Sequence, residues 1–157
     1  MRQIAIILGS KADLGVFTAA RRLLEEGQVP YELKILSAHR HLPQLLEFVR
    51  NFEADGGQVL IAGAGMAAHL PGIIAASTRL PVIGVPLEAG PLRGLDALLS
   101  MVQMPRGTPV ATMTIGTHGA INAVLLALRI LGLQYDWAEE VLKNYGTALR
   151  GQSEAAL

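Results

Sequence analysis

The chain has 157 residues, the usual length of one domain, with 51% hydrophobic and 17% charged residues. This composition is too apolar for a disordered chain and supplies enough apolar residues for a core. The 13 Lys and Arg residues balance the 13 Asp and Glu residues, which argues against nonspecific nucleic-acid binding because that binding needs excess cations. The chain has no cysteine, so disulfides and thiolate metal sites are excluded and a cytoplasmic location is expected.

Apolar runs alternate along the chain with segments in which apolar residues recur at helical spacing. The first run, "QIAIIL", ends at Gly9 and is too short for a signal sequence or a membrane span. The expected elements, in chain order, are a strand at 3–8, a helix at 13–27, a strand at 31–36, a helix at 42–57, a strand at 58–63, a helix at 69–78, a strand at 81–86, a helix at 94–104, a strand at 109–115, and helices at 119–132 and 134–150. The tail "GQSEAAL" is expected to be loosely held.

Strands that alternate with helices and are apolar on both faces predict a parallel sheet covered on both sides. Right-handed crossovers then give a three-layer α/β/α domain that takes in the whole chain, 1–157. The helix at 119–132 is apolar nearly all round. It is therefore expected to be either a central packing element or part of a subunit interface.

Ligands of open α/β sheets bind at the carboxyl ends of the strands, so the segments after the strands are the candidates for a site. The first three, "GSKAD", "SAHRH" and "GAGMAAH", share one edge and are expected to converge on one pocket. In the first segment, Ser10 and Asp13 suit the capping of the helix that follows. They equally suit a ligand, with Ser10 and free N–H groups on a phosphate and Asp13 on sugar hydroxyls.

The second segment places an imidazole beside a fixed positive charge. Arg40 is suited to bind phosphate through its forked guanidinium, and its charge favours the neutral, basic form of His39. One alternative is a solvated polar loop. Another is a metal pair of His39 and His41, for which only His69 and His118 remain to complete a set of histidines.

The third segment, "GAGMAAH", matches the G-x-G-x-x-A pattern of dinucleotide-binding loops. The match is weak, because the acidic partner expected about twenty residues further on is only approximated by Glu88. The glycines can instead let the backbone approach a flat ring closely. His69 begins the next helix, where capping or packing is as reasonable as catalysis, and a nucleotide-binding module without catalysis stays an alternative.

Six segments, spread from about residue 4 to residue 132, carry a resemblance in their order: "GSKAD", "SAHR", "IAGAGMAAHLPG", "PVIGVP", "GLDALLSMVQMPRGTPVAT" and "GAINAVLLALRIL". This ordered set resembles the N5-carboxyaminoimidazole ribonucleotide mutase family of purine biosynthesis. The resemblance is to the mutase branch, since the sequence has "SAHR" rather than "SAHK" and "AGAG" rather than an "AGRSN" loop. The carboxylase branch, which joins free carbon dioxide to aminoimidazole ribonucleotide, is the alternative enzyme.

The resemblance implies a flavodoxin-like sheet of strand order 2-1-3-4-5, a single catalytic domain and a homo-octamer. It implies that the carboxyl group of N5-carboxyaminoimidazole ribonucleotide moves from the exocyclic nitrogen to ring C4, giving 4-carboxy-5-aminoimidazole ribonucleotide by decarboxylation and recarboxylation. It implies no metal, no organic cofactor and no ATP. The expected partners are the small-molecule ribonucleotide and further copies of the chain, with neither nucleic acid nor membrane.

By motif, the resemblance also assigns residues to roles. The expected catalytic residues are His39, the general acid and base, and His69, which borders the carboxylate. The expected substrate-binding residues are Ser10, Ser37 and Arg40 for the 5′-phosphate, Asp13 for the ribose hydroxyls, Gly63, Ala64 and Gly65 against the imidazole ring, and Leu70.

The sequence departs from commoner family patterns near these motifs, at Ala12, Leu14, His41 and Met66. Met66 stands where glycine is common, so a positive φ there would strain the backbone. His41 is expected either to change its loop or to add a cation near the phosphate.

Overall fold

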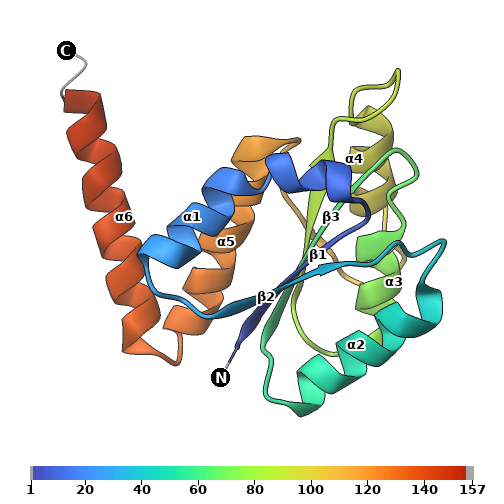
Figure 1. Cartoon of the computed structure of the whole chain (residues 1–157), viewed down its shortest axis with the longest axis horizontal. Coiled ribbons are helices and arrows are strands. Elements are labelled where there is room, and N and C mark those ends of the chain that lie inside the picture. The colour runs from blue at the N-terminus through green and yellow to red at the C-terminus, as the bar shows by residue number, and fades with distance from the viewer. Residues whose placement is uncertain (1, 155–157) are drawn as a thin grey trace.

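The computed structural model describes residues 2–154, except for the side chains of 152–154. Its centre is a parallel five-stranded sheet of order β2-β1-β3-β4-β5 (Figure 1). The strands are β1 (Ile4–Leu8), β2 (Tyr31–Ile35), β3 (Val59–Gly65), β4 (Val82–Leu87) and β5 (Ala111–Thr112). The predicted fold class and strand order are confirmed.

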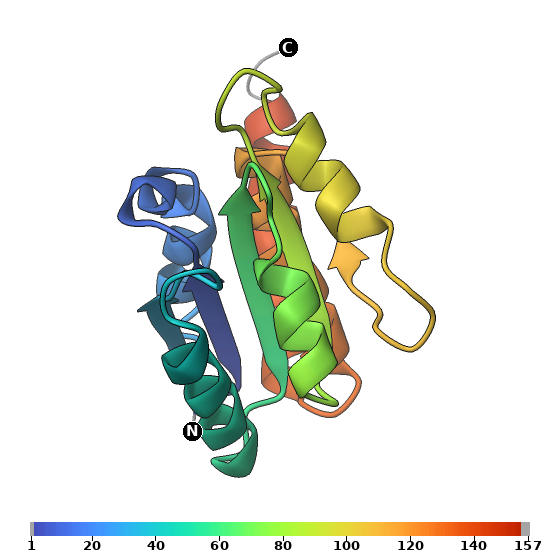
Figure 2. The same cartoon turned by 90° about the vertical axis from the view of Figure 1, so that its right-hand side faces the viewer.

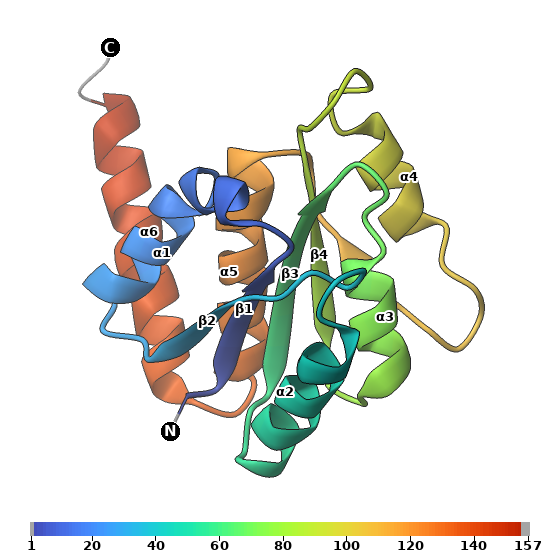
Figure 3. The ribbon, with the colours of Figure 1, turned by 45° about the vertical axis from the view of Figure 1, so that its right-hand side comes forward.

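Helices cover both faces of the sheet, as Figures 2 and 3 show from two further sides. One layer contains α1 (Thr18–Glu26), α5 (Thr117–Gly132) and α6 (Asp136–Glu154), and the other contains α2 (Leu42–Ala54), α3 (Leu70–Ser77) and α4 (Leu95–Val102). Alternate residues of β1 serve the two layers: Ile4 and Ile6 pack toward α1 and α5, whereas Ala5 and Ile7 pack toward α2 and α3. This alternation explains why the central strands are apolar on both faces.

The apolar helix α5 is a central packing element. Its side chains at Ala123, Val124, Ala127 and Leu128 are fully buried in the core shared with α1 and the sheet. The amphipathic helix α6 then lies against α5 on the outside (Figure 1). Packing on two sides within one chain accounts for the nearly all-round apolarity of α5.

The last strand is much shorter than the predicted 109–115, and a proline in its neighbour limits its carboxyl end. The N–H of Met113 donates to the carbonyl oxygen of Gly84, so Gly84 and the alternate residue Pro86 direct their backbone groups toward β5. Pro86 has no N–H to donate, and the ladder cannot continue past it. Its carbonyl oxygen accepts instead from Gly116, where the chain turns into α5.

Two helix predictions also need correction. The expected helix at 13–27 is divided into a short 3₁₀ helix, η1 (Lys11–Gly15), and α1, because Phe17 is turned inward and fully buried between them. The C-terminal helix, expected to end at 150, continues through Gly151 to Glu154, so part of the expected loose tail is helical. The last three residues of that tail, 155–157, lie outside the described residues.

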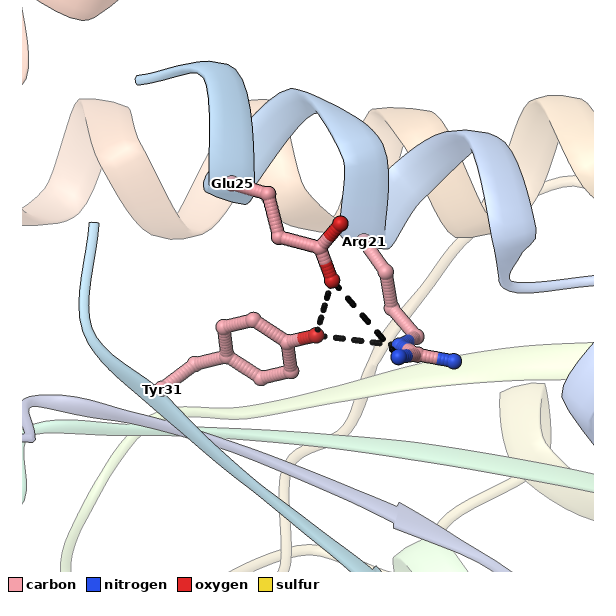
Figure 4. Close-up of polar contacts among 3 residues, drawn as sticks. All are labelled: Arg21, Glu25 and Tyr31. Atoms are coloured by element: carbon pink, nitrogen blue, oxygen red, sulfur yellow. Dashed lines mark hydrogen bonds and ion pairs between the residues drawn. The ribbon is translucent and has the colours of Figure 1, made fainter. Parts of the chain in front are cut away.

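A polar cluster ties the edge strand β2 to α1 (Figure 4). The Arg21 Nε donates to the Tyr31 hydroxyl at 2.9 Å, and that hydroxyl donates to the Glu25 Oε1, also at 2.9 Å. Arg21 and Glu25 also approach each other at 3.6 Å. These contacts hold the amino end of β2, the strand whose carboxyl end carries the "SAHRH" loop.

Candidate active site

A cavity of about 520 Å³ lies at the carboxyl ends of the strands. Leu8 of β1 pairs with Ile35 on one side and with Gly63 on the other, so three strands end at nearly the same level. The cavity is lined by Gly9, Ser10, Ala12, Asp13, Ser37, Ala38, His39, Arg40, Ala64, Gly65, Met66, Ala67, His69, Leu70 and Ala89. The predicted convergence of the first three loops is confirmed.

Two histidines from different loops meet in this cavity. The His39 Nε2 lies 2.8 Å from the His69 Nδ1, and the ring planes are inclined at 73°. At that distance one nitrogen carries a hydrogen and the other presents a lone pair, so one hydrogen bond joins the two rings. Although His69 occupies the N-cap position of α3, its side chain caps no helix N–H. The structure therefore favours a role in the cavity for His69 over capping.

The first loop shows the predicted capping and leaves ligand binding by the same residues open. The Ser10 Oγ accepts from the N–H of Ala12 at 3.2 Å, and the Asp13 Oδ2 accepts from the N–H of Ser10 at 2.9 Å, which is a reciprocal capping arrangement. Both side chains also line the cavity. Burial raises the pKa of Asp13 above its ordinary value of 3.8, and the hydrogen bond from Ser10 partly offsets this shift.

The second loop presents the positive charge of the cavity. Its Ser37 is only 8% exposed, and the Ser37 carbonyl oxygen accepts from the N–H groups of Arg40 at 3.3 Å and His41 at 2.8 Å. This tight turn brings His39 and Arg40 out into the cavity. Arg40 is the only Lys or Arg among the lining residues, so an anionic group is best placed against this loop.

The His39–His41 metal pair is not what the geometry shows. His39 meets His69, whereas the His41 Nδ1 accepts from the N–H of Ser37 at 3.3 Å and His41 does not line the cavity. Among the side chains that the structure describes, those of residues 2–151, no three His, Cys, Asp or Glu are grouped so that they could hold a metal ion. No helix within residues 2–154 is long and apolar enough to cross a membrane.

Two residues of the third loop, Gly63 and Ala68, do not line the cavity. Gly63 is one layer below the lining, where a Cβ would lie 2.6 Å from the Phe17 ring and 2.9 Å from the Leu8 side chain. Its carbonyl oxygen accepts from the N–H of Gly9 at 3.1 Å. Packing therefore explains the glycine at 63. Of the three residues predicted to lie against a substrate ring, Ala64 and Gly65 line the cavity.

Sequence reasoning assigned no role to six residues of the lining, which are Gly9, Ala12, Ala38, Met66, Ala67 and Ala89. Met66 has a φ of 55° and is 55% exposed, and its side chain reaches over Gly90, 3.6 Å from the place of a Cβ there. The φ at position 66 is therefore positive, which is the case in which a Cβ strains the backbone. Ala89 closes the cavity from the loop after β4, where a Cβ on Gly65 would be only 2.7 Å away. Ala89 could have been found from the sequence, because it lies in the segment that follows the fourth predicted strand.

Comparison with known proteins gives consistent results. A family model described as AIR carboxylase matches residues 3–152. A relative from Pyrococcus abyssi, named N5-carboxyaminoimidazole ribonucleotide mutase, is 53% identical over 145 residues, which is 92% of this chain and 82% of the relative. A relative of the same name from Pyrococcus horikoshii is 56% identical over 142 residues, 90% of this chain and 79% of the relative. The crystal structure of Treponema denticola PurE has a TM-score of 0.84 and 25% identity, covering 97% of this chain and 94% of that chain.

Proposed function

Because the chain belongs to the AIR carboxylase family, we propose that it moves the carboxyl group of N5-carboxyaminoimidazole ribonucleotide from the exocyclic nitrogen to ring C4 in purine biosynthesis. The relatives from Pyrococcus abyssi and Pyrococcus horikoshii carry the name of this mutase. The observation that carries the proposal is the 2.8 Å contact between the His39 Nε2 and the His69 Nδ1 in the cavity, which supports an acid/base role for this pair. A carboxyl shift between nitrogen and carbon needs a proton transfer at both of its steps.

The lining offers a distinct surface to each part of the substrate. Arg40, Ser37 and Ser10 hold the 5′-phosphate, since Arg40 is the cation of the lining and the serines add hydroxyl groups. Asp13, half-buried on the same side, accepts from the ribose hydroxyls. The imidazole ring lies against a floor of small and apolar side chains, which is formed by Ala64, Gly65, Ala67, Leu70 and Ala89.

The reaction balances with one proton that leaves His39 and returns to it. In the first half, the bond between the exocyclic nitrogen and the carboxyl carbon breaks, carbon dioxide departs, and protonated His39 gives its proton to that nitrogen. In the second half, ring C4 attacks the carbon dioxide, and neutral His39 takes the proton that C4 loses. His69 stays hydrogen-bonded to His39 in both halves, and this bond stabilises the positive charge on the imidazole that carries it.

Retention of the carbon dioxide makes the second half efficient. Both halves use one anchored ribonucleotide, so the recarboxylation is effectively unimolecular and gains the advantage of proximity. The contacts to phosphate and ribose keep C4 in place while the carboxyl group moves. Met66 lies over Gly90 and adds its side chain to the lining.

A second candidate is the carboxylase reaction, which joins free carbon dioxide to aminoimidazole ribonucleotide. The description of the matching family model, AIR carboxylase, is the observation that supports it. The same residues serve this reaction, since it is the second half of the proposed mechanism. A requirement for added bicarbonate distinguishes the carboxylase from the mutase.

We also propose that the chain works in the cytoplasm as a homo-octamer. Four apolar side chains on or beside α4 are more than half exposed in the single chain: Leu92, Leu95, Leu99 and Val102. They recur at helical spacing and form one apolar stripe, which supports contact with other copies of the chain. Sedimentation should give eight chains per particle, and a monomer at micromolar concentration would contradict this part of the proposal.

The experiment for the proposed reaction follows absorbance of the C4-carboxylated product when the protein is mixed with N5-carboxyaminoimidazole ribonucleotide alone. We expect the wild type to accelerate product formation and the His39→Asn variant to lose a factor of about 10² to 10⁴ in kcat. Substrate affinity should stay within about tenfold, or ~1.4 kcal/mol. His118→Asn, which makes the same change at an exposed position on α5, is the matched control. Equal loss in both variants would remove His39 from the mechanism.

A further inference from the structure

The ring of His41 makes a bond that its place in the fold does not call for. His41 is the N-cap residue of α2, a position where a side chain ordinarily accepts from the first N–H groups of the helix. The His41 side chain makes no such bond. Its Nδ1 accepts from the N–H of Ser37 instead, at 3.3 Å.

The bond supplies a partner that the sheet cannot give. Ser37 follows β2, which is the edge strand, and the N–H of the preceding Leu36 donates inward to the carbonyl oxygen of Leu8 at 2.9 Å. Successive N–H groups of an extended chain alternate in direction, so the Ser37 N–H points to the side where no strand lies. Ser37 is only 8% exposed, and water has little access to this donor.

His41 therefore closes the loop twice. Its backbone N–H donates to the Ser37 carbonyl oxygen at 2.8 Å, and its ring accepts from the Ser37 N–H. The closed turn contains only Ala38, His39 and Arg40, and all three line the cavity. A backbone N–H can only donate, so the His41 Nδ1 must present its lone pair.

We propose that His41 is a positioning residue, which holds His39 and Arg40 in their working places by binding the Ser37 N–H. This inference rests on the proposed function, because it concerns the same cavity. His41 does not itself line that cavity, so it acts through the loop and has no contact with the substrate. Without the hydrogen bond to the His41 ring, the loop is held at Ser37 by its carbonyl oxygen alone. The side chains of His39 and Arg40 then become more mobile.

The test uses the fact that asparagine and glutamine place an acceptor oxygen at different points. The Asn oxygen falls near the position of the His Nδ1, whereas the Gln oxygen falls near the position of the His Nε2. His41→Asn keeps the acceptor that Ser37 needs, and His41→Gln and His41→Ala do not. We expect His41→Gln and His41→Ala to lower kcat/KM about tenfold to hundredfold, through a lower kcat and a higher KM, since small displacements of a reacting group have effects of this size. His41→Asn should stay within about threefold of the wild type, because one neutral hydrogen bond is retained.

Amide hydrogen exchange at Ser37 gives a second readout that needs no substrate. Exchange should be about twofold to tenfold faster in His41→Gln and His41→Ala than in the wild type and His41→Asn, as expected for one lost hydrogen bond. The full chain is used throughout, with His118→Asn as the exposed-histidine control. Unchanged Ser37 exchange in His41→Ala, or equal loss of activity in His41→Asn and His41→Gln, would overturn the proposal. A wild-type protein that does not turn over the ribonucleotide would overturn the proposed function and, with it, the catalytic part of this inference. The exchange data decide separately whether the His41 ring holds the Ser37 N–H.

Discussion

Met66 offers a test of backbone strain at the rim of the cavity. Its φ of 55° lies in the left-handed region, where a Cβ costs about 1–2 kcal/mol. Replacement by glycine removes that cost, but it loosens the unfolded chain and so loses about 0.4–1 kcal/mol. The side chain is 55% exposed, and little packing is lost with it. The free energy of unfolding should therefore rise by about 1 kcal/mol in Met66→Gly, the difference of these two contributions.

Met66→Ala isolates the backbone contribution, because alanine removes the long side chain but keeps the Cβ. The glycine variant should be more stable than the alanine variant by about 1 kcal/mol, the reverse of the ordinary order. Leu133 provides the matched control, since it is 90% exposed and has an ordinary φ of −65°. At that position the alanine variant should be the more stable of the two.

The assay is equilibrium unfolding in urea at one fixed protein concentration. For a slope of about 2 kcal/mol/M, the expected difference moves the midpoint by about 0.5 M. Glycine and alanine variants that rank in the same order at Met66 as at Leu133 would refute the reasoning. In that event, the positive φ would carry no strain in this loop.

Three further predictions concern charge, packing and protonation. Arg40→Ala should raise the half-saturating substrate concentration about tenfold or more, since a charge-assisted hydrogen bond contributes about 1.5–3 kcal/mol. An unchanged half-saturating concentration in steady-state kinetics would contradict the role of Arg40 at the phosphate. Gly63→Ala should lower the free energy of unfolding in urea by about 1–3 kcal/mol, because its Cβ would lie 2.6 Å from the Phe17 ring, and an unchanged midpoint would show that the ring moves freely. Burial raises the pKa of Asp13 in the folded chain, so ionisation of this carboxyl group costs more free energy there than in the unfolded chain. The contribution of Asp13 to stability therefore falls as the pH rises from the ordinary pKa of 3.8 through the raised pKa. Asp13→Asn should therefore gain stability relative to the wild type across that interval in urea unfolding at several pH values, and a pH-independent difference would argue against the raised pKa.

The parallel sheet followed from local patterns, since each central strand is a continuous apolar run. Its strand order was predicted from the family resemblance and not from these patterns. The errors arose where a distant residue decided the outcome. The carboxyl end of β5 depends on Pro86 in the neighbouring strand, and no pattern within 109–115 reports that. The division of the first helix depends on Phe17 and its place beneath Gly63, which is likewise a tertiary contact.

The site was predictable to the extent that it depends on strand ends. Residues that follow parallel strands come to one edge, and this rule brought His39 and His69 into one cavity from positions 30 residues apart. Side-chain directions were beyond the sequence. The bond from Ser37 to the His41 ring and the closing contact of Ala89 both depend on how the loops fold against each other. The exclusion of Gly63 from the lining has the same origin.

The most direct test of the central claim is the fate of the carboxyl carbon. N5-carboxyaminoimidazole ribonucleotide labelled with ¹³C in that carboxyl group would be incubated with the protein and unlabelled bicarbonate, without ATP or metal, and the product examined by mass spectrometry. If the carbon dioxide stays in the cavity between the two halves of the reaction, as we propose, the product keeps the ¹³C label. Product that carries unlabelled carbon would contradict the direct transfer, and would identify the carboxylase reaction as the one that this cavity performs.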